Sequence, residues 1–169
     1  PMHVSDVGAQ AHPICRNFLD ACAAAGFAPT PDFNGAEMEG TGLWQMTIQD
    51  GRRVSSATAF LNPARDRPNL QIETGAHVTR VLFESNRACG VEFVQGATKR
   101  EVRAAPEVVL SGGAINSPQL LQLSGIGQGA LLQRLGIPVL VDAPMVGQGL
   151  QDHVAVCHFY HSKVPTLIQ

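Results

Sequence analysis

The sequence predicts a mixed α/β fold, in which helices accompany an antiparallel meander and strands of a parallel sheet. Short alternating runs follow one another between residues 70 and 111, and their connections are too short for parallel crossovers. By contrast, the run VVL at 108–110 is uninterrupted and apolar, which is typical of a strand covered on both faces. A leucine-rich helical pattern follows it directly. Both kinds of sheet are therefore expected in one chain.

The first predicted element is a helix over residues 12–26. Pro13 suits the first helical turn, and Gly26 can end the helix. Apolar residues recur at four-residue spacing, so we expect one stripe of this helix to face a core. The stripe comprises Ile14, Phe18 and Cys22.

A loop, a hairpin and a short helix are expected next. The stretch 29–42 is rich in Pro, Gly and acidic residues, which predicts an irregular loop. An Asp-Gly step within 43–54 predicts a hairpin turn, because this dipeptide tolerates positive φ angles. Ser55 and Ser56 are N-cap candidates for a short helix that should end near Pro63.

The second half of the chain predicts five short strands and two helices. The middle three strands form an antiparallel meander over 77–104, while Ser117 caps a helix that has Pro118 at its first position and stops at Gly125. A second short helix ends at Gly136 and precedes a further apolar strand. The five strands span 70–74, 77–84, 88–95, 99–104 and 107–111, and the last apolar strand is IPVLV at 137–141.

Composition excludes several classes of protein. The chain has 169 residues, 15% of them charged, with a net charge of −2 and no Lys/Arg cluster, so nucleic acid is not expected as a partner. Its longest uncharged apolar stretches fall short of the roughly 18–20 residues that a bilayer span requires. The start PMHVSDV has no signal-peptide pattern, and the histidines and cysteines have no metal-ligand spacing. We therefore expect a cytoplasmic protein without a metal site.

The turn Ser111–Ala114 is a candidate ligand contact. Gly112 and Gly113 lack Cβ atoms, so another group can approach the main chain closely, and nearby N–H groups can meet a polar or anionic ligand. The same glycines would also let a helix pack against a strand, and the residues alone leave both interpretations open. The alternating glycines at 125–132 follow a helix end and lack the third fingerprint glycine, so no complete dinucleotide motif is present.

The segment GAINSPQLLQLSGIG, residues 113–127, resembles the second signature of the glucose-methanol-choline (GMC) oxidoreductases. The similarity extends in order through DFNGAEMEGTG, DGRRVSSATAFLNPA and LGIPVLVDAPMVGQGLQDH. It implies an FAD-binding, Rossmann-like domain interrupted by a three-stranded antiparallel meander, together with part of a substrate-binding domain. Residues 1–69 and 156–169 would then belong to the substrate-binding domain, and residues 70–155 to the FAD-binding domain. The matching positions are Gly113, Ala114, Ser117, Pro118, Leu120, Leu121, Ser124, Gly125, Ile126 and Gly127.

The resemblance also implies cofactor contacts. In the family, a valine at the position of Val78 touches the adenine through its main chain, and the turn that follows the apolar run lies against the adenosine half of FAD. The expected contacts are therefore Val78, Ser111, Gly112, Gly113 and Ala114. The pyrophosphate-binding turn and the catalytic histidine of the family have no counterpart here, so the chain is expected to be an internal segment without catalytic residues and inactive alone.

His153 is the one candidate neighbour of the active site. It ends GLQDH, a loop that runs close to the active site in the family, and both a direct contact and a structural role remain open. Because adjacent residues in an extended segment point to opposite sides, Asp152 cannot orient His153 simply by being next to it.

The reaction implied is oxidation of a primary alcohol to an aldehyde, in which a histidine takes the hydroxyl proton and the hydride passes to flavin. Choline-oxidising relatives place a glutamate where this chain has Ala155, which favours a neutral alcohol over choline. The alternatives are a choline dehydrogenase, or a non-catalytic module that binds a nucleotide or a partner. Peripheral association of the complete protein with the inner membrane and self-association of the isolated chain are further expectations. The electron acceptor is left open.

Overall fold

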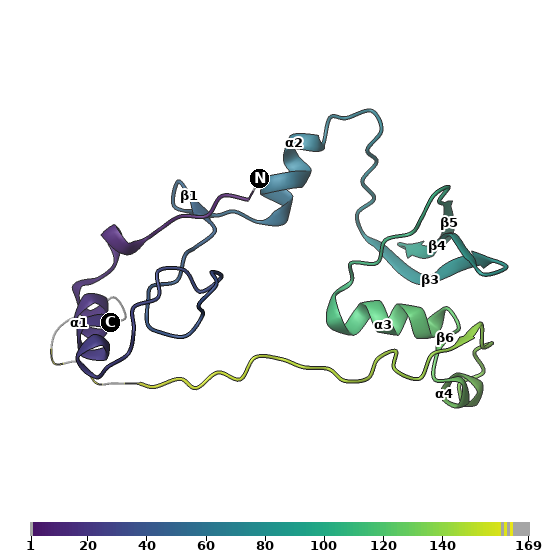
Figure 1. The fold of residues 1–169 in the computed structure, drawn as a ribbon. Helices are drawn as coiled ribbons and strands as arrows, with labels where there is room; N and C mark the ends of the chain where they lie inside the picture. Colours follow the sequence, from purple (N-terminus) through teal and green to yellow (C-terminus); the bar gives the residue numbers. More distant parts are fainter. Residues whose placement is uncertain (1, 160, 162, 164–169) are drawn as a thin grey trace. The chain divides into compact units, whose positions relative to one another are not determined.

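The computed structural model describes residues 2–159, 161 and 163, and the chain forms two compact units (Figure 1). The first unit holds residues 1–71 together with those from 158 onward, and the second holds residues 72–157. Each unit has a small core of its own. Val54 is buried in the first unit, and Val81, Phe93 and Leu132 are buried in the second.

The first unit begins with a 3-10 turn η1 (Gly8–Gln10) and helix α1 (Pro13–Ala24). Both predicted ends of α1 are confirmed: the His12 imidazole Nδ1 accepts the N–H of Ile14 at 3.3 Å, and Gly26 has φ +92°. The prediction that the apolar stripe faces a core is wrong, because Ile14 is 41% exposed and Phe18 is 61% exposed.

The loop and hairpin follow the sequence prediction. Residues 29–42 are irregular, and the main-chain N–H of Thr30 donates to the Thr41 carbonyl at 2.7 Å, which closes the loop on itself. The hairpin pairs β1 (Ile48–Gln49) with β2 (Arg52–Arg53), and its turn residues Asp50 and Gly51 have φ +51° and +72°. These are the positive angles that a type I′ turn requires.

The predicted short helix after the hairpin is confirmed, and it ends at Ala64, next to Pro63. The Ser55 hydroxyl accepts the N–H of Thr58 at 3.2 Å, so Ser55 is a capping residue, whereas the side chain of Ser56 makes no capping hydrogen bond. A π-helical turn η2 (Ala57–Leu61) continues into α2 (Asn62–Ala64), which passes Pro63. Pro63 is tolerated because it lies in the first turn of α2.

The second unit is built on the predicted meander, which is confirmed together with the mixed α/β class. Strands β3 (Ala76–Glu84), β4 (Arg87–Gln95) and β5 (Thr98–Arg103) pair antiparallel in the order β3-β4-β5. The strands predicted at 70–74 and 107–111 are wrong, since no described strand offers them hydrogen-bond partners. Val109 is consequently 75% exposed.

Helix α3 (Gly113–Leu123) follows the extended segment 107–111. The prediction that Ser117 caps this helix is wrong: α3 begins at Gly113 and contains Pro118. Pro118 is the sixth residue of α3, so it removes the N–H that would otherwise donate to the Ala114 carbonyl. The predicted stop is confirmed, because Gly125 has φ +90°.

The remaining elements of the second unit are short. β6 (Ile126–Gly127) pairs in parallel with β7 (Val141–Asp142), and α4 (Gly129–Arg134) lies between them in sequence. The predicted second helix is therefore confirmed, but only Val141 of the predicted strand 137–141 is in a strand. None of the described helices is long and apolar enough to cross a bilayer.

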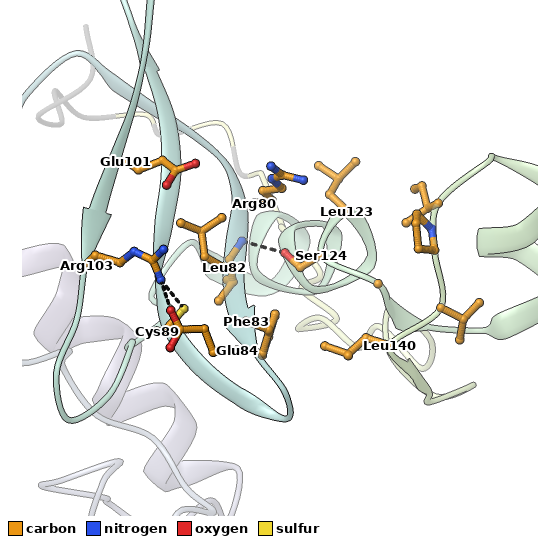
Figure 2. Close-up of a pocket in the computed structure, with 15 residues that line it drawn as sticks. Arg80, Leu82, Phe83, Glu84, Cys89, Glu101, Arg103, Leu123, Ser124 and Leu140 are labelled. Carbon is orange, nitrogen blue, oxygen red and sulfur yellow. Dashed lines mark hydrogen bonds and ion pairs between the residues drawn. The ribbon is translucent and has the colours of Figure 1, made fainter.

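Ser124 joins α3 to the meander. Its hydroxyl donates to the Leu120 carbonyl at 2.6 Å and accepts the main-chain N–H of Val81 at 2.8 Å (Figure 2). Val81 lies in β3, an edge strand of the meander, so no further strand is present to receive its outward N–H. One side chain thus satisfies a helix carbonyl and a strand amide.

Glu92 is the most highly connected charged side chain of the meander. Its residue is only 4% exposed, and its carboxylate accepts hydrogen bonds from Lys99 at 2.6 Å, Thr79 at 2.7 Å and Arg80 at 2.9 Å. The hydrogen bond from Lys99 is the largest cause that lowers the pKa of Glu92 from 4.5 to about 2, followed by those of Thr79 and Arg80. Glu92 therefore stays ionised throughout the neutral range.

We predict that Ser124→Ala lowers the free energy of unfolding of the complete protein by about 1–3 kcal/mol, because it leaves a partly buried amide unpaired. Chemical denaturation measures this change. Ser56→Ala is the matched control and should change the value by less than about 0.5 kcal/mol, since its side chain makes no capping bond. Equal effects of the two substitutions would contradict the role of Ser124.

Glu92 should also make stability depend on pH. Its folded pKa of about 2 is below 4.5, so its contribution is fully present above pH 4.5 and is lost as the pH falls toward 2. The difference in unfolding free energy between wild type and Glu92→Gln should shrink across that window. Lys99→Met removes the largest cause of the lowered folded pKa, so the loss should still begin near pH 4.5 but end at a higher pH and be smaller in total. Acid titration of stability gives both curves, and parallel curves for wild type and Glu92→Gln would refute the prediction.

Candidate functional site

A cavity of about 650 Å³ lies in the second unit, between β3, the extended segment 108–112 and α3. This volume is within the range of about 300–1,000 Å³ that is typical of small-molecule sites. Its walls are mostly apolar and carry a few uncharged polar groups. The lining residues that enter the argument are His77, Val78, Ser111, Gly112, Asn116 and Gln119.

Helix α3 supplies one wall of the cavity. Asn116, Leu120 and Leu123 line it and recur at four- and three-residue spacing, so they share one face of the helix. Leu123 is adjacent to Ser124, whose hydrogen bond to Val81 holds this end of the helix against β3. The wall is therefore fixed relative to the strand opposite it.

A β-bulge shapes the other wall. Val78 pairs with Phe93 and Arg80 pairs with Glu92, so Thr79 is an extra residue in β3. Val81 pairs with Val91, two residues from Phe93, which places Val78 and Val81 in equivalent positions of the ladder. Because the Val81 N–H points outward to Ser124, the main chain of Val78 also faces the outer edge of the meander.

The turn before α3 has the geometry that its glycines permit. The N–H of Gly112 donates to the Ser117 hydroxyl at 3.0 Å, and Gly113 has φ +86°. Side-chain-bearing residues rarely adopt that angle. Nothing lies within 4 Å of the position that a Gly113 Cβ would take, so the need for glycine here comes from the main-chain angle.

The structure brings together some of the predicted contacts and separates others. Val78, Ser111 and Gly112 line the same cavity, although they come from segments more than thirty positions apart. Ala114 lines a different hollow of about 460 Å³, beside Gly147 and Leu150. Asn116 and Gln119 are lining residues that the sequence did not predict. A predicted helix start at Gly113 would have placed both residues on the face of α3 that lines the cavity.

His153 lies in an extended segment of the second unit and is exposed. The Asp152 carboxylate accepts the main-chain N–H of His153 at 2.8 Å. This hydrogen bond involves the main chain of His153 and not its imidazole ring.

A second hollow of about 470 Å³ lies where the meander meets the end of α3 (Figure 2). On its rim, Arg103 donates to the Glu84 carboxylate at 2.6 Å and to the Cys89 sulfur at 3.0 Å. The charge interaction with Cys89, followed by the hydrogen bond to Glu84, raises the pKa of Arg103 further above its ordinary value. Arg103 is consequently a permanent cation with its partners already present.

A cavity at a glycine turn between an extended segment and a helix is typical of nucleotide-binding α/β domains. The chain belongs to the GMC oxidoreductase family, whose model matches residues 1–155. The resemblance inferred from residues 113–127 is thus confirmed, and so is the assignment to a family of FAD-dependent oxidoreductases.

Individual relatives agree with this assignment. The chain is 51% identical over 156 residues to the mitochondrial choline dehydrogenase of Homo sapiens, covering 92% of this chain and 26% of that protein. It is 46% identical over 147 residues to an alcohol dehydrogenase [acceptor] of Pseudomonas putida, covering 86% and 27%. The crystal structure of pyridoxine 4-oxidase from Mesorbium loti matches with a TM-score of 0.77 and 37% identity, covering 83% and 28%. The chain therefore spans about a quarter of the length of these relatives.

Family membership supports FAD as the cofactor. The cavity fits the adenosine half of that molecule in size and in its mostly apolar, uncharged lining. No carboxylate is among its lining residues, so nothing in the wall repels the adjacent phosphates. Val78 offers an outward main chain, and Gly112 offers close approach to the backbone.

We predict that Gly113→Ala destabilises the apoprotein by about 1–2 kcal/mol, because alanine is strained at φ +86°. Gly112→Ala should cost less, since Gly112 has φ −80° and a Cβ there meets Asn116 at 3.3 Å, a contact that a small shift relieves. Denaturation without FAD separates main-chain strain from cofactor contact. A larger loss for Gly112→Ala would contradict the argument.

Proposed function

We propose that residues 70–155 form part of the FAD-binding domain of an alcohol dehydrogenase and hold the adenosine half of the cofactor. The flanking residues 1–69 and 156–169 would contribute to its substrate-binding domain. The observation that carries the proposal is the single cavity at which Val78, Ser111 and Gly112 meet. Val78 is more than thirty positions away from Ser111 and Gly112 in sequence, and all three were expected at the same ligand.

Each wall of the cavity has a separate task in binding. The outward main chain of Val78 offers a donor and an acceptor to the edge of an adenine ring. Gly112 contributes main chain without a side chain to the cavity wall, next to Asn116. Asn116 and Gln119 add side-chain amides from α3, which can donate and accept without placing a charge near the phosphates.

The chemistry of the complete protein would be alcohol oxidation. When bound, FAD supplies the hydride acceptor that converts a primary alcohol to an aldehyde. The base that removes the hydroxyl proton is proposed to lie outside this chain. Within it, His153 is proposed to lie near the reaction, because it ends GLQDH, a loop that runs close to the active site in the family.

The substrate is proposed to be a neutral primary alcohol. A quaternary ammonium needs an anionic or aromatic neighbour. Ala155 is small and apolar at the position where choline-oxidising relatives carry a glutamate. Choline remains the second candidate, because the chain is 51% identical to a human choline dehydrogenase over most of its length.

The purified complete protein should show a flavin absorbance spectrum and reduce an artificial electron acceptor with a higher kcat/KM for a neutral primary alcohol than for choline. Ala155→Glu should shift that ratio toward choline by about fivefold, the effect of an ion pair worth about 1 kcal/mol. Val154→Glu is the matched control, since it adds the same charge one residue away.

Two results would contradict the proposal. A complete protein that purifies without flavin would exclude the proposed cofactor role. A wild-type protein that prefers choline would exclude the neutral-alcohol assignment and leave choline oxidation as the function.

A further inference from the structure

Glu92 lies outside the cavity, yet its contacts lie at the bulge that shapes one wall. Its carboxylate accepts from Thr79 Oγ1 at 2.7 Å and from Arg80 Nη2 at 2.9 Å and Nε at 3.2 Å. Thr79 and Arg80 are adjacent residues of β3 that together face one residue of β4. In a regular strand, neighbouring side chains point to opposite faces of the sheet. Both reach one carboxylate here because the bulge lies opposite it.

The bulge determines which edge of β3 the main chain of Val78 faces. Val78 and Val81 are three positions apart, so in a regular strand they would face opposite edges. The extra residue brings them into register with Phe93 and Val91, two positions apart on β4. Since the N–H of Val81 is directed outward to Ser124, removal of the bulge would turn the main chain of Val78 inward, toward β4.

The buried carboxylate is specific to this arrangement. Glu92 is 4% exposed and lies between the apolar residues Val91 and Phe93, and a buried charge persists only when it is paired and hydrogen-bonded. Thr79 and Arg80 satisfy it only while both lie opposite it. Lys99 also pairs with the Glu92 carboxylate, at 2.6 Å. It belongs to β5, which lies on the opposite side of β4 from the bulge in β3.

We propose that Glu92 is a positioning residue for the cofactor: by holding Thr79 and Arg80 in the bulge, it directs the main chain of Val78 into the adenosine cavity. This inference rests on the proposed function, because it assumes that the cavity takes the adenosine half of FAD. It assigns a cofactor-binding effect to a side chain that does not itself line the cavity.

The test measures FAD affinity in the complete protein. Apoprotein of each variant is titrated with FAD, and the dissociation constant is read from the change in flavin fluorescence near pH 7.5. Glu92→Gln and Thr79→Val should each weaken FAD binding by about tenfold or more, because each removes a hydrogen bond that defines the bulge. Thr79→Ser keeps the hydroxyl and should restore the wild-type value. At saturating FAD, kcat of both weakened variants should return to within about twofold of wild type.

Lys99→Met is the matched control. It removes a contact to the same carboxylate without touching the bulge, so FAD affinity should stay within about twofold of wild type. If Lys99→Met weakens FAD as much as Glu92→Gln, or if Thr79→Val binds FAD as tightly as Thr79→Ser, the inference is wrong. If Glu92→Gln fails to fold, the comparison of FAD affinity between Thr79→Val and Thr79→Ser is sufficient to test the inference. A wild-type protein that binds no FAD overturns the proposed function itself, whereas tight FAD binding by every variant overturns only the role of Glu92.

Discussion

The cavity depends on the hydrogen bond between the Ser124 hydroxyl and the main-chain N–H of Val81. This bond joins the end of α3 to β3, and these two elements are opposite walls of the site. β3 is an edge strand at this point, so a helix-capping side chain takes the place of a neighbouring strand. Gly125 allows the chain to turn away immediately afterwards, because it adopts φ +90°.

In this structure, the family signature over 113–127 holds main-chain groups of the site in place. Its two serines accept N–H groups that belong to other segments: Ser117 accepts that of Gly112, and Ser124 accepts that of Val81. Two of its glycines, Gly113 and Gly125, have φ angles that favour glycine. The segment holds the walls of the cavity together and supplies no reacting group. The same signature can therefore occur in proteins that act on different substrates.

The sequence predicts the meander because its links are too short for any other pairing. It misplaces the start of α3, since Pro118 favours a first-turn position and the Gly112–Gly113 pair looks like a turn. It predicts strands at 107–111 and 137–141, of which only Val141 is in a strand. The strand pairing that these apolar runs would need is mostly missing among the described residues. The alternating pattern of β3 does not reveal the bulge at Thr79. The indication in the sequence is the charged Glu92 between the apolar residues Val91 and Phe93, opposite the bulge.

In the proposed function, the outward main chain of Val78 and the turn at Ser111–Gly112 together hold the adenosine half of FAD. An experimental structure of the complete protein with FAD tests it most directly, through the distance between the adenine ring and the main-chain N and O atoms of Val78. The account predicts hydrogen bonds of about 2.7–3.2 Å at this residue, with the ribose against Gly112. An adenosine bound elsewhere, with β3 and α3 in contact across a closed cavity, would contradict it.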